Sequence, residues 1–170
     1  MKLSQRSSPH CDDRPAGTKV SLVVIHNISL PPDEYGGPWI DDLFMGRLDP
    51  KAHPYFEAIA AARVSSHYLI RRDGSVVQYV PSDKRAWHAG VSSWKGRERC
   101  NDFSIGIELE GSDGIAFMDA QYDALNELLR SLSFRYGELD IAGHSDVAPG
   151  RKTDPGPAFQ WERVKAPRRA

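Results

Sequence analysis

The 170-residue sequence has no long hydrophobic run, only two cysteines and almost no net charge. No stretch approaches the roughly 20 apolar residues that a membrane-spanning helix needs, and the first residues lack the apolar core of a secretory signal peptide. Cys11 and Cys100 stand alone, which excludes a disulfide scaffold and favours a reducing compartment. We therefore expect a cytoplasmic protein. The net charge of -1 argues against general binding to nucleic acid or to an anionic membrane, since both need an excess of Lys and Arg.

Length and composition indicate a single globular domain that spans residues 1–170. The content of 40% hydrophobic and 26% charged residues is ordinary for such domains. A chain of this size buries roughly 70% of the surface that it exposes when unfolded. Residues 1–18 are polar, so we expect them to form a leader on the surface. The basic end, residues 165–170, is expected to fray.

Periodicity predicts an α/β fold in which helices flank a mixed central β-sheet. Residues 20–25 are apolar on both faces, which is typical of a central strand in a covered sheet. Asp73-Gly74 between two β-rich runs predicts a hairpin. The apolar stripe of residues 119–136 predicts a helix that Gly137 ends. Further strands are expected at 103–110 and 139–143, and shorter helical segments at 39–45, 54–62 and 159–164.

Two of the predicted strands end in a histidine. His26 and His144 hold these positions, and polar side chains at strand ends emerge at the rim of an α/β sheet. Glycines and prolines after His144 exclude a helix or a long strand, so we expect a stiff loop at 143–157 that aims several side chains at one point. In this loop Asp146 and Asp154 compete as the third metal ligand. We favour Asp154, which returns after the proline turn, and expect Asp146 to orient a ligand from outside.

Two imidazoles and one carboxylate are typical of a catalytic zinc site, because they leave one corner of the tetrahedral ion open. Such an ion makes hydroxide available near neutral pH. Glu108 and Glu110 share one face of a predicted strand, and two acids on one strand face usually point to solvent. Beside a metal ion, however, one of them, such as Glu108, can carry a proton from water to a leaving amine. Lys152 can stabilise the oxyanion that develops on the attacked carbonyl. Together these groups predict hydrolysis of an amide.

Other residues allow more than one interpretation. His67 lies inside a predicted strand and is interpreted as a structural histidine with satisfied hydrogen bonds. Trp87 and His88 lie near a turn, where such a ring is either a packing plug or a platform for a ligand, and the sequence leaves both open. Arg63, at the start of a strand, is placed to face the same rim as the metal.

Five parts of the sequence resemble the zinc-dependent type 2 amidases, a family related to the peptidoglycan recognition proteins. They are VIHNISLPP (24–32), RVSSHY (63–68), AWHAG (86–90), NDFSIGIELEG (101–111), and GHSD (143–146) with RKTDPGP (151–157). The likeness extends from about residue 9 to residue 161. The resemblance implies a mixed sheet flanked by helices. It also implies hydrolysis, in peptidoglycan recycling, of the amide bond between N-acetylmuramic acid, or its 1,6-anhydro form, and L-alanine.

The resemblance further implies a role for individual residues. The family's zinc ligands match His26, His144 and Asp154, its catalytic carboxylate matches Glu108, and its transition-state lysine matches Lys152. Positions that hold the muramyl-peptide match Asn27, Arg63, Trp87 and Arg99, and the free carboxylates of a peptide stem suit arginine. The implied cofactor is Zn²⁺ and the implied partner is a small muramyl-peptide. We expect a monomer that binds neither nucleic acid nor membrane.

Alternatives stay open at this point. A peptidoglycan-recognition module would bind muramyl-peptides without cutting them, and it would need neither the full metal triad nor the pair Glu108 and Lys152. An exported amidase would act on polymeric peptidoglycan, but the missing signal peptide counts against it. The same ligands also admit another divalent ion, although nitrogen and oxygen donors with an open corner favour zinc.

Overall fold

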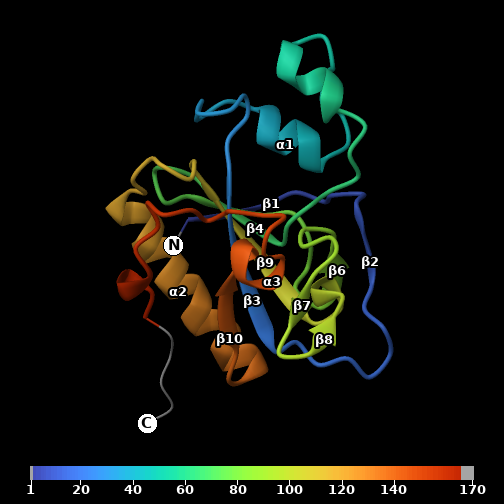
Figure 1. Cartoon of the computed structure of the whole chain (residues 1–170), viewed down its shortest axis with the longest axis vertical. Helices are drawn as coiled ribbons and strands as arrows, with labels where there is room; N and C mark the ends of the chain where they lie inside the picture. The colour runs from blue at the N-terminus through green and yellow to red at the C-terminus, as the bar shows by residue number, and fades with distance from the viewer. Residues whose placement is uncertain (1, 166–170) are drawn as a thin grey trace.

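A computed structural model describes residues 2–165, and its centre is a six-stranded mixed β-sheet with the strand order β1-β5-β4-β9-β3-β10 (Figure 1). The strands are β1 (Leu3–Gln5), β3 (Leu22–Ile28), β4 (Tyr68–Ile70), β5 (Val76–Gln78), β9 (Ser104–Glu110) and β10 (Asp140–Gly143). The predicted α/β class with a mixed sheet is confirmed. The basic tail beyond Lys165 lies outside the described residues.

The middle of the sheet is parallel and apolar. β3 pairs in parallel with β9 on one side and with β10 on the other, and β9 pairs in parallel with β4. The first four residues of β3 are fully buried, because both faces of a central strand are covered. β4 and β5 are antiparallel and are joined through Asp73-Gly74, where Gly74 adopts a positive φ of 80°. The predicted hairpin and central strand are therefore both present.

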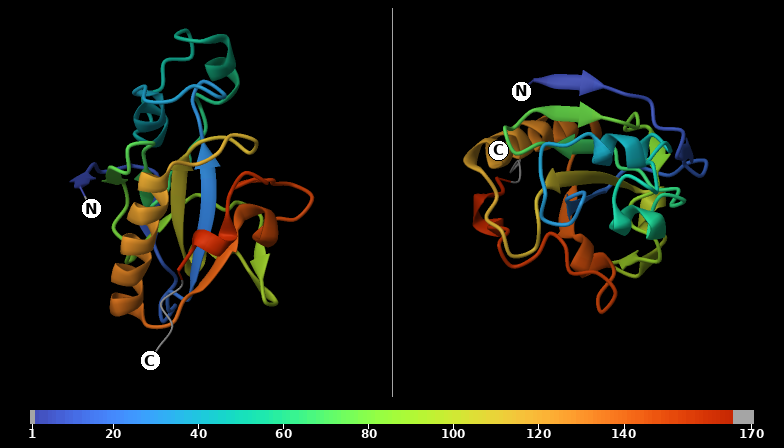
Figure 2. Two further views of the ribbon diagram at one scale, coloured as in Figure 1. Left: turned by 90° about the vertical axis from the view of Figure 1, so that its left-hand side faces the viewer. Right: turned by 90° about the horizontal axis from the view of Figure 1, so that it is seen from above.

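One helix covers one face of the sheet. α2 (Asp119–Tyr136) runs along this face in Figure 2 and ends at Gly137, as the sequence predicts. Its leucines, such as Leu125 and Leu129, pack in one cluster with Ile105 and Ile107 of β9. Burying one such side chain contributes about 1.5–3 kcal/mol. None of the helices described within residues 2–165 is long and apolar enough to cross a membrane.

The opposite face is covered by short elements rather than by one long helix. Near β4 and β5 these are α1 (Trp39–Phe44) and a 3-10 helix η1 (Pro54–Ala58), whose side chains form a second apolar cluster. Near β3 lie β6 (Lys84–Ala86), β7 (Ser93–Trp94), β8 (Arg97–Glu98) and the 3-10 helix η2 (Cys100–Asp102). A third apolar cluster joins Cys100 and Phe103 to Leu22 and Val24 of β3. The last element is the 3-10 helix η3 (Trp161–Arg163).

Residues 1–18 are more than the surface leader expected from the sequence. β1 extends the central sheet by pairing in parallel with β5, and β2 (Cys11–Asp13) pairs antiparallel with β6. His10 is buried, and Arg14 donates hydrogen bonds to the carbonyls of Ser82 and Ser104. The strands are short, polar edge strands, so they lack the apolar alternation by which strands are recognised.

Two further expectations need correction. The loop expected at 143–157 begins with a short helix, α3 (His144–Val147), because the Asp146 carboxylate accepts a hydrogen bond from the Gly143 N–H at 2.7 Å and caps that turn. Glu110 does not face solvent: it is buried, and its carboxylate pairs with Arg71 at 3.0 Å and accepts a hydrogen bond from the Gly36 N–H at 2.7 Å. Glu110 thereby attaches the segment before α1 to the sheet.

His67 is a fully buried structural histidine, as predicted. Its Nδ1 accepts a hydrogen bond from the Gly106 N–H at 3.0 Å, so Nε2 carries the proton and donates to the Lys84 carbonyl at 3.0 Å. The Arg14 guanidinium lies 3.1 Å from Nε2. Burial lowers the pKa of His67 to about 3; the hydrogen bond to the Lys84 carbonyl opposes this shift, and the charge of Arg14 adds a smaller lowering. The imidazole is therefore neutral in the folded protein at neutral pH.

The lowered pKa predicts acid sensitivity. The unfolded chain protonates His67 near its ordinary pKa of about 6.5, whereas the folded chain does so near pKa 3. The stability that neutral His67 contributes to the fold is complete above pH 6.5. It is lost as the pH falls, by up to about 1.4 kcal/mol per pH unit. In urea unfolding of metal-free protein between pH 7.5 and 5, we expect the stability of His67→Gln to fall less steeply than that of the wild type. Equal slopes would contradict this assignment.

Candidate active site

The strand register places His26 and Glu108 side by side. In the parallel pairing of β3 with β9, His26 is opposite Glu108. Side chains alternate along a strand, and Val23, Ile25 and Ile107 fill the face against α2. His26 and Glu108 therefore point to the opposite face, where α2 cannot cover them. Both are buried there.

His144 and Asp154 are brought to His26 by β10 and the segment after it. Gly143 at the end of β10 pairs with Ile25, so the next residue of each strand, His144 and His26, emerges at the same rim. The backbone N–H of Ser145 donates to the Asp154 carbonyl at 2.9 Å, which returns the loop to the start of α3. Gly143 leaves room for this return, because a Cβ there would lie 2.9 Å from Pro155 Cδ.

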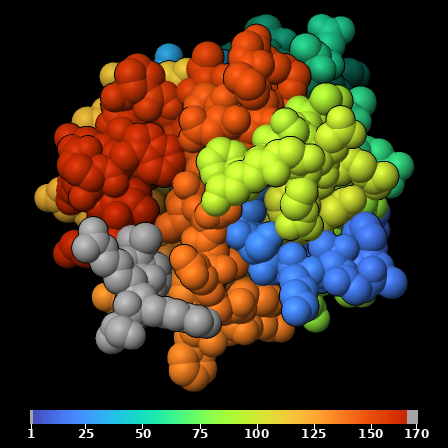
Figure 3. All heavy atoms as spheres, turned by 60° about the horizontal axis from the view of Figure 1, so that its bottom comes forward, coloured from blue at the N-terminus to red at the C-terminus, as the bar shows by residue number. Residues whose placement is uncertain are grey.

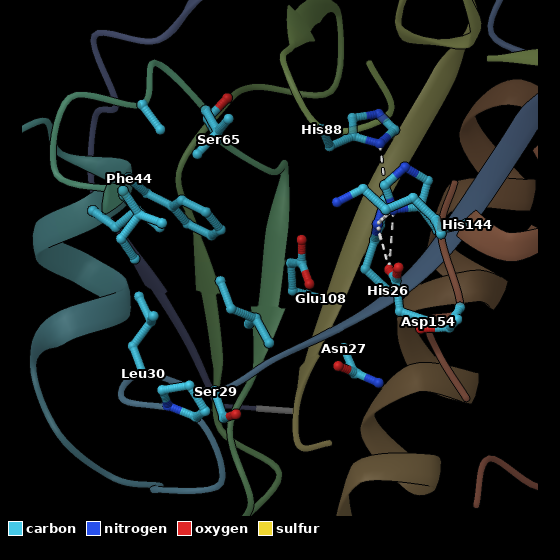
Figure 4. A pocket seen from close by; sticks show the side chains of 18 of the residues that line it. His26, Asn27, Ser29, Leu30, Phe44, Ser65, His88, Glu108, His144 and Asp154 are labelled. Atoms are coloured by element: carbon cyan, nitrogen blue, oxygen red, sulfur yellow. Dashed lines mark hydrogen bonds and ion pairs between the residues drawn. The ribbon is translucent and has the colours of Figure 1, made fainter. Parts of the chain in front are cut away.

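The three side chains form a compact triangle of donor atoms. His26 Nδ1 lies 3.0 Å from His144 Nδ1, and Asp154 Oδ2 lies 3.1 Å from each nitrogen (Figure 4). Donors bound at about 2.0–2.1 Å to one tetrahedral ion are about 3.3 Å apart, so the triangle suits a single metal ion. Among the described residues, His26, His144 and Asp154 are the group whose ligand atoms lie close enough together to hold a metal ion. The sequence alternative, Asp146, caps α3 instead.

The protonation states of these residues suit metal binding. Burial lowers the pKa of His26 to about 4, so its imidazole is neutral and has a lone pair to offer. Burial raises the pKa of Asp154, but its contacts with the imidazoles of His144 and His26 outweigh burial and hold the pKa below the usual range. The outer nitrogens are also engaged: His144 Nε2 lies 3.0 Å from the Ala89 carbonyl, and His26 Nε2 lies 2.9 Å from His88 Nδ1.

Glu108 is an unusual carboxylate for the interior of a protein. Its Oε2 is buried and makes no hydrogen bond within residues 2–165. Burial raises the pKa of Glu108 well above its ordinary value; the charge of Asp154 raises it too, and the charge of Lys152 lowers it. Because burial disfavours its charged form, this carboxyl group accepts a proton more readily than a solvent-exposed glutamate, which suits a general acid or base.

A cavity of about 610 Å³ lies in front of these residues, and Glu108, Asn27, Trp87 and Lys152 all line it. Apolar side chains from the segment around α1 form its far wall, including Leu30 and Phe44 in Figure 4. The Asn27 amide donates to Asp113 Oδ1 at 2.7 Å and to the Pro155 carbonyl at 3.1 Å. These bonds fix Asn27 at the rim, beside the loop that carries Asp154.

A hydrogen bond to the N-terminal segment fixes Trp87 in the cavity wall, a contact that the sequence did not predict. Its indole N–H donates to Asp12 Oδ1 at 3.1 Å, and Arg85 binds both oxygens of Asp12 at 2.7 and 2.6 Å. The Arg63 guanidinium lies 5.3 Å from the centre of the Trp87 ring. Trp87 therefore serves as part of the cavity wall. Its partner Asp12 is 75 positions away in the sequence, so no local pattern points to it.

Two of the residues that the sequence predicts to bind the substrate lie outside this cavity. Arg63 is exposed and reaches the cavity only through its stacking on Trp87. Arg99 is exposed, pairs with Asp102 at 3.3 Å and lines a neighbouring hollow of about 550 Å³. Arg151 lines both spaces and donates to the Ala89 and Val91 carbonyls. Figure 3 shows the yellow-green segment around these carbonyls against the orange-red residues after β10.

Comparison with known proteins assigns most of the chain to one family. Residues 16–157 match the family described as N-acetylmuramoyl-L-alanine amidase. The chain is 63% identical over 161 residues to the 1,6-anhydro-N-acetylmuramyl-L-alanine amidase AmpD of Citrobacter freundii. The alignment covers 94% of this chain and 86% of that protein.

Solved structures agree with this match. A crystal structure of a selenomethionine derivative of AmpD superposes with a TM-score of 0.94 at 61% identity, covering 96% of this chain and 92% of that one. The amidase AmiD of E. coli, in complex with the substrate anhydro-N-acetylmuramic acid-L-Ala-D-gamma-Glu-L-Lys, superposes with a TM-score of 0.62 at 32% identity. That match covers 89% of this chain and 59% of AmiD.

Two glycines in the loop that carries Asp154 differ in their surroundings. Gly150 and Gly156 both have a positive φ, 76° and 81°. A Cβ at Gly150 would meet nothing within 4 Å, whereas a Cβ at Gly156 would lie 2.3 Å from Asp113 Cα. The Ala158 N–H also donates to the Asp113 carbonyl at 3.0 Å, so this part of the loop packs closely on Asp113.

The difference between these glycines predicts unequal effects of alanine. Gly150→Ala should lower the free energy of unfolding by about 1–2 kcal/mol, the cost of the left-handed conformation. Gly156→Ala should cost about 1–3 kcal/mol more, because the backbone must also move away from Asp113. It should weaken metal binding as well, since Asp154 lies two residues away. Denaturant unfolding and metal titration of both variants check this; equal losses would show that the contact with Asp113 has no energetic role.

Proposed function

Because the chain belongs to the N-acetylmuramoyl-L-alanine amidase family, we propose that it hydrolyses the amide bond between N-acetylmuramic acid and the L-alanine of muramyl-peptides. The sugar of the substrate is N-acetylmuramic acid or its 1,6-anhydro form, and the reaction belongs to peptidoglycan recycling. The observation that carries this proposal is the triangle of His26, His144 and Asp154 beside the buried carboxylate of Glu108 in an open cavity.

We propose Zn²⁺ as the cofactor of this site, held by His26, His144 and Asp154. Two neutral imidazoles and one carboxylate are a donor set that zinc prefers, and three protein ligands leave a position free for catalysis. When bound, zinc supplies Lewis acidity and makes hydroxide available near neutral pH. The ion also compensates charge, because Glu108 and Asp154 are two largely buried acids in one cavity.

Glu108 is the proposed proton carrier. It takes a proton from the attacking water as the carbon–oxygen bond forms, and it gives that proton to the alanine nitrogen as the amide bond breaks. Burial raises its pKa, which favours uptake of the proton from water. Its Oε2 has no other hydrogen-bond partner among the described residues, which leaves it free for this exchange.

The remaining assigned residues orient the substrate and stabilise charge. Lys152 lines the cavity and is close enough to lower the pKa of Glu108, so its ammonium can stabilise the oxyanion on the attacked lactyl carbonyl. Asn27 and Trp87 contact the muramyl-peptide from the rim and the wall. We propose that Arg63 and Arg99, which lie beyond the cavity, bind the free carboxylates of the peptide stem.

A recognition module that binds muramyl-peptides without cutting them is the alternative from another functional class. Such a module has no use for a buried carboxylate with a raised pKa next to a metal triad, and maintaining one costs stability. Incubation of the protein with an anhydro-muramyl-peptide, followed by mass spectrometry, decides between them: an amidase releases the free peptide. A cytoplasmic location and a monomeric state stay predictions.

Removal of the metal or of a ligand should abolish activity. Asp154→Ala and His144→Ala should each lose bound zinc and turnover, because two remaining donors hold the ion weakly. Asp146→Ala is the matched control in the same loop; it should retain zinc and activity while losing about 1 kcal/mol of stability as a helix cap. Elemental analysis and the cleavage assay, before and after chelation, measure both properties. Full activity after complete removal of zinc would refute the proposal.

Substitution of Glu108 should separate chemistry from metal binding. Glu108→Gln keeps the shape of the side chain but cannot accept a proton, so kcat should fall by about 10²–10⁴-fold while zinc remains bound. Lys152→Met should likewise retain zinc and lower kcat. Zinc content and steady-state kinetics are measured on the same preparations. A wild-type rate for Glu108→Gln would exclude its role as proton carrier.

A further inference from the structure

His88 has a defined position directly behind the metal triad. It is half-buried, lines the cavity and follows β6, and its ring lies over Gly106 of β9. A Cβ at Gly106 would lie 2.5 Å from His88 Cγ, so only glycine leaves space for the imidazole at this point of the strand. The sequence left His88 open between a packing plug and a ligand platform, and neither describes this position.

The ring of His88 joins a chain of hydrogen bonds that begins at His26. His26 turns Nδ1 toward His144 and Asp154, and its other nitrogen, Nε2, lies 2.9 Å from His88 Nδ1. On the far side, His88 Nε2 lies 3.2 Å from the Ser104 hydroxyl. If Nδ1 of His26 offers its lone pair to a metal, Nε2 must carry the proton. His26 then donates to His88 Nδ1, and His88 donates through its own Nε2–H to Ser104.

The two metal-binding histidines therefore have different partners behind them. His144 Nε2 has the Ala89 carbonyl, a usual partner for a ligating histidine. His26 has a neutral imidazole instead of the carboxylate often found in this role. A carboxylate here would add a third acid to a site that already has Asp154 and Glu108. A neutral acceptor holds the ring of His26 without lowering the net positive charge of the metal.

We propose that His88 is a positioning residue for the metal site: it fixes the tautomer and the ring orientation of His26, with Ser104 behind it and Gly106 beneath it. The inference rests on the proposed metal-dependent function and goes beyond it, since it assigns a role to a residue outside the metal triad and outside the pair Glu108 and Lys152. Removing such a partner typically lowers metal affinity about 10–100-fold.

Zinc affinity of the metal-free, full-length protein tests this, by competition with a chromogenic chelator. His88→Ala should bind zinc about 10–100-fold more weakly than the wild type. His88→Asn should recover most of the affinity, because its Oδ1 can replace Nδ1 as the acceptor. His67→Gln is the comparison variant: it removes a buried histidine whose ring packs edge-on against His88 but does not bond to His26, so its zinc affinity should fall much less than that of His88→Ala. Equal losses in His88→Ala and His67→Gln would overturn the proposal, as would wild-type affinity in His88→Ala.

A measurement on the wild type avoids dependence on variants that do not fold. In the zinc-loaded protein, ¹H–¹⁵N spectra of the histidine rings should show a slowly exchanging proton on His26 Nε2 with a coupling across the hydrogen bond to His88 Nδ1. Its absence in the loaded protein would overturn the proposal. A wild-type chain that binds no zinc, or binds it without cleaving muramyl-peptides, would instead contradict the proposed function.

Discussion

In the parallel ladder between β3 and β9, His26 lies directly opposite Glu108, and the alternation of side chains turns both away from α2. The other chemical groups depend on this register. A shift of one strand by one residue would exchange its two faces and place either the imidazole or the carboxylate among the leucines of α2. Because Ile25 and Ile107 already fill the helix-facing side, the apolar core selects the register that the site requires.

The same arrangement creates an electrostatic problem that a cation solves. Glu108 is buried, Asp154 is largely buried, and the nearby ammonium of Lys152 is exposed to solvent. Buried carboxylates without compensation either take up protons or destabilise the fold. The pKa of Glu108 is raised, whereas contacts with the imidazoles of two histidines hold that of Asp154 down. Neighbouring acids whose pKa values move in opposite directions are suited to different roles, one as a ligand and the other as a proton carrier.

Local patterns were sufficient for much of this fold and site. The apolar run of β3, the turn at Gly74 and the stripe of α2 each reflect interactions within a few residues, so periodicity identified them. β1, β2 and the bond between Asp12 and Trp87 depend on partners more than 70 positions away, and their short, polar segments carry no periodic signal. The burial of Glu110 was missed for a similar reason, since its partner Arg71 lies between β4 and β5, 39 positions away in the sequence. His26 and His144 were identifiable because each directly follows a mostly apolar run of residues, although β3 continues past His26 to Ile28.

Loops are usually less precise than strands as supports for a site, yet one ligand and the proposed lysine lie on a loop here. Hydrogen bonds to neighbouring segments hold this loop in place. The Asp154 carbonyl accepts from the Ser145 N–H, and Asp113 accepts from both the Asn27 amide and the Ala158 N–H. The loop is thus bonded to α3 before it and to the chain after β9. Asn27 follows His26 on β3, and its amide also donates to the Pro155 carbonyl, which connects the loop to the strand that supplies the first ligand. Such bonds let a segment with little regular structure hold a carboxylate within hydrogen-bond distance of two histidines.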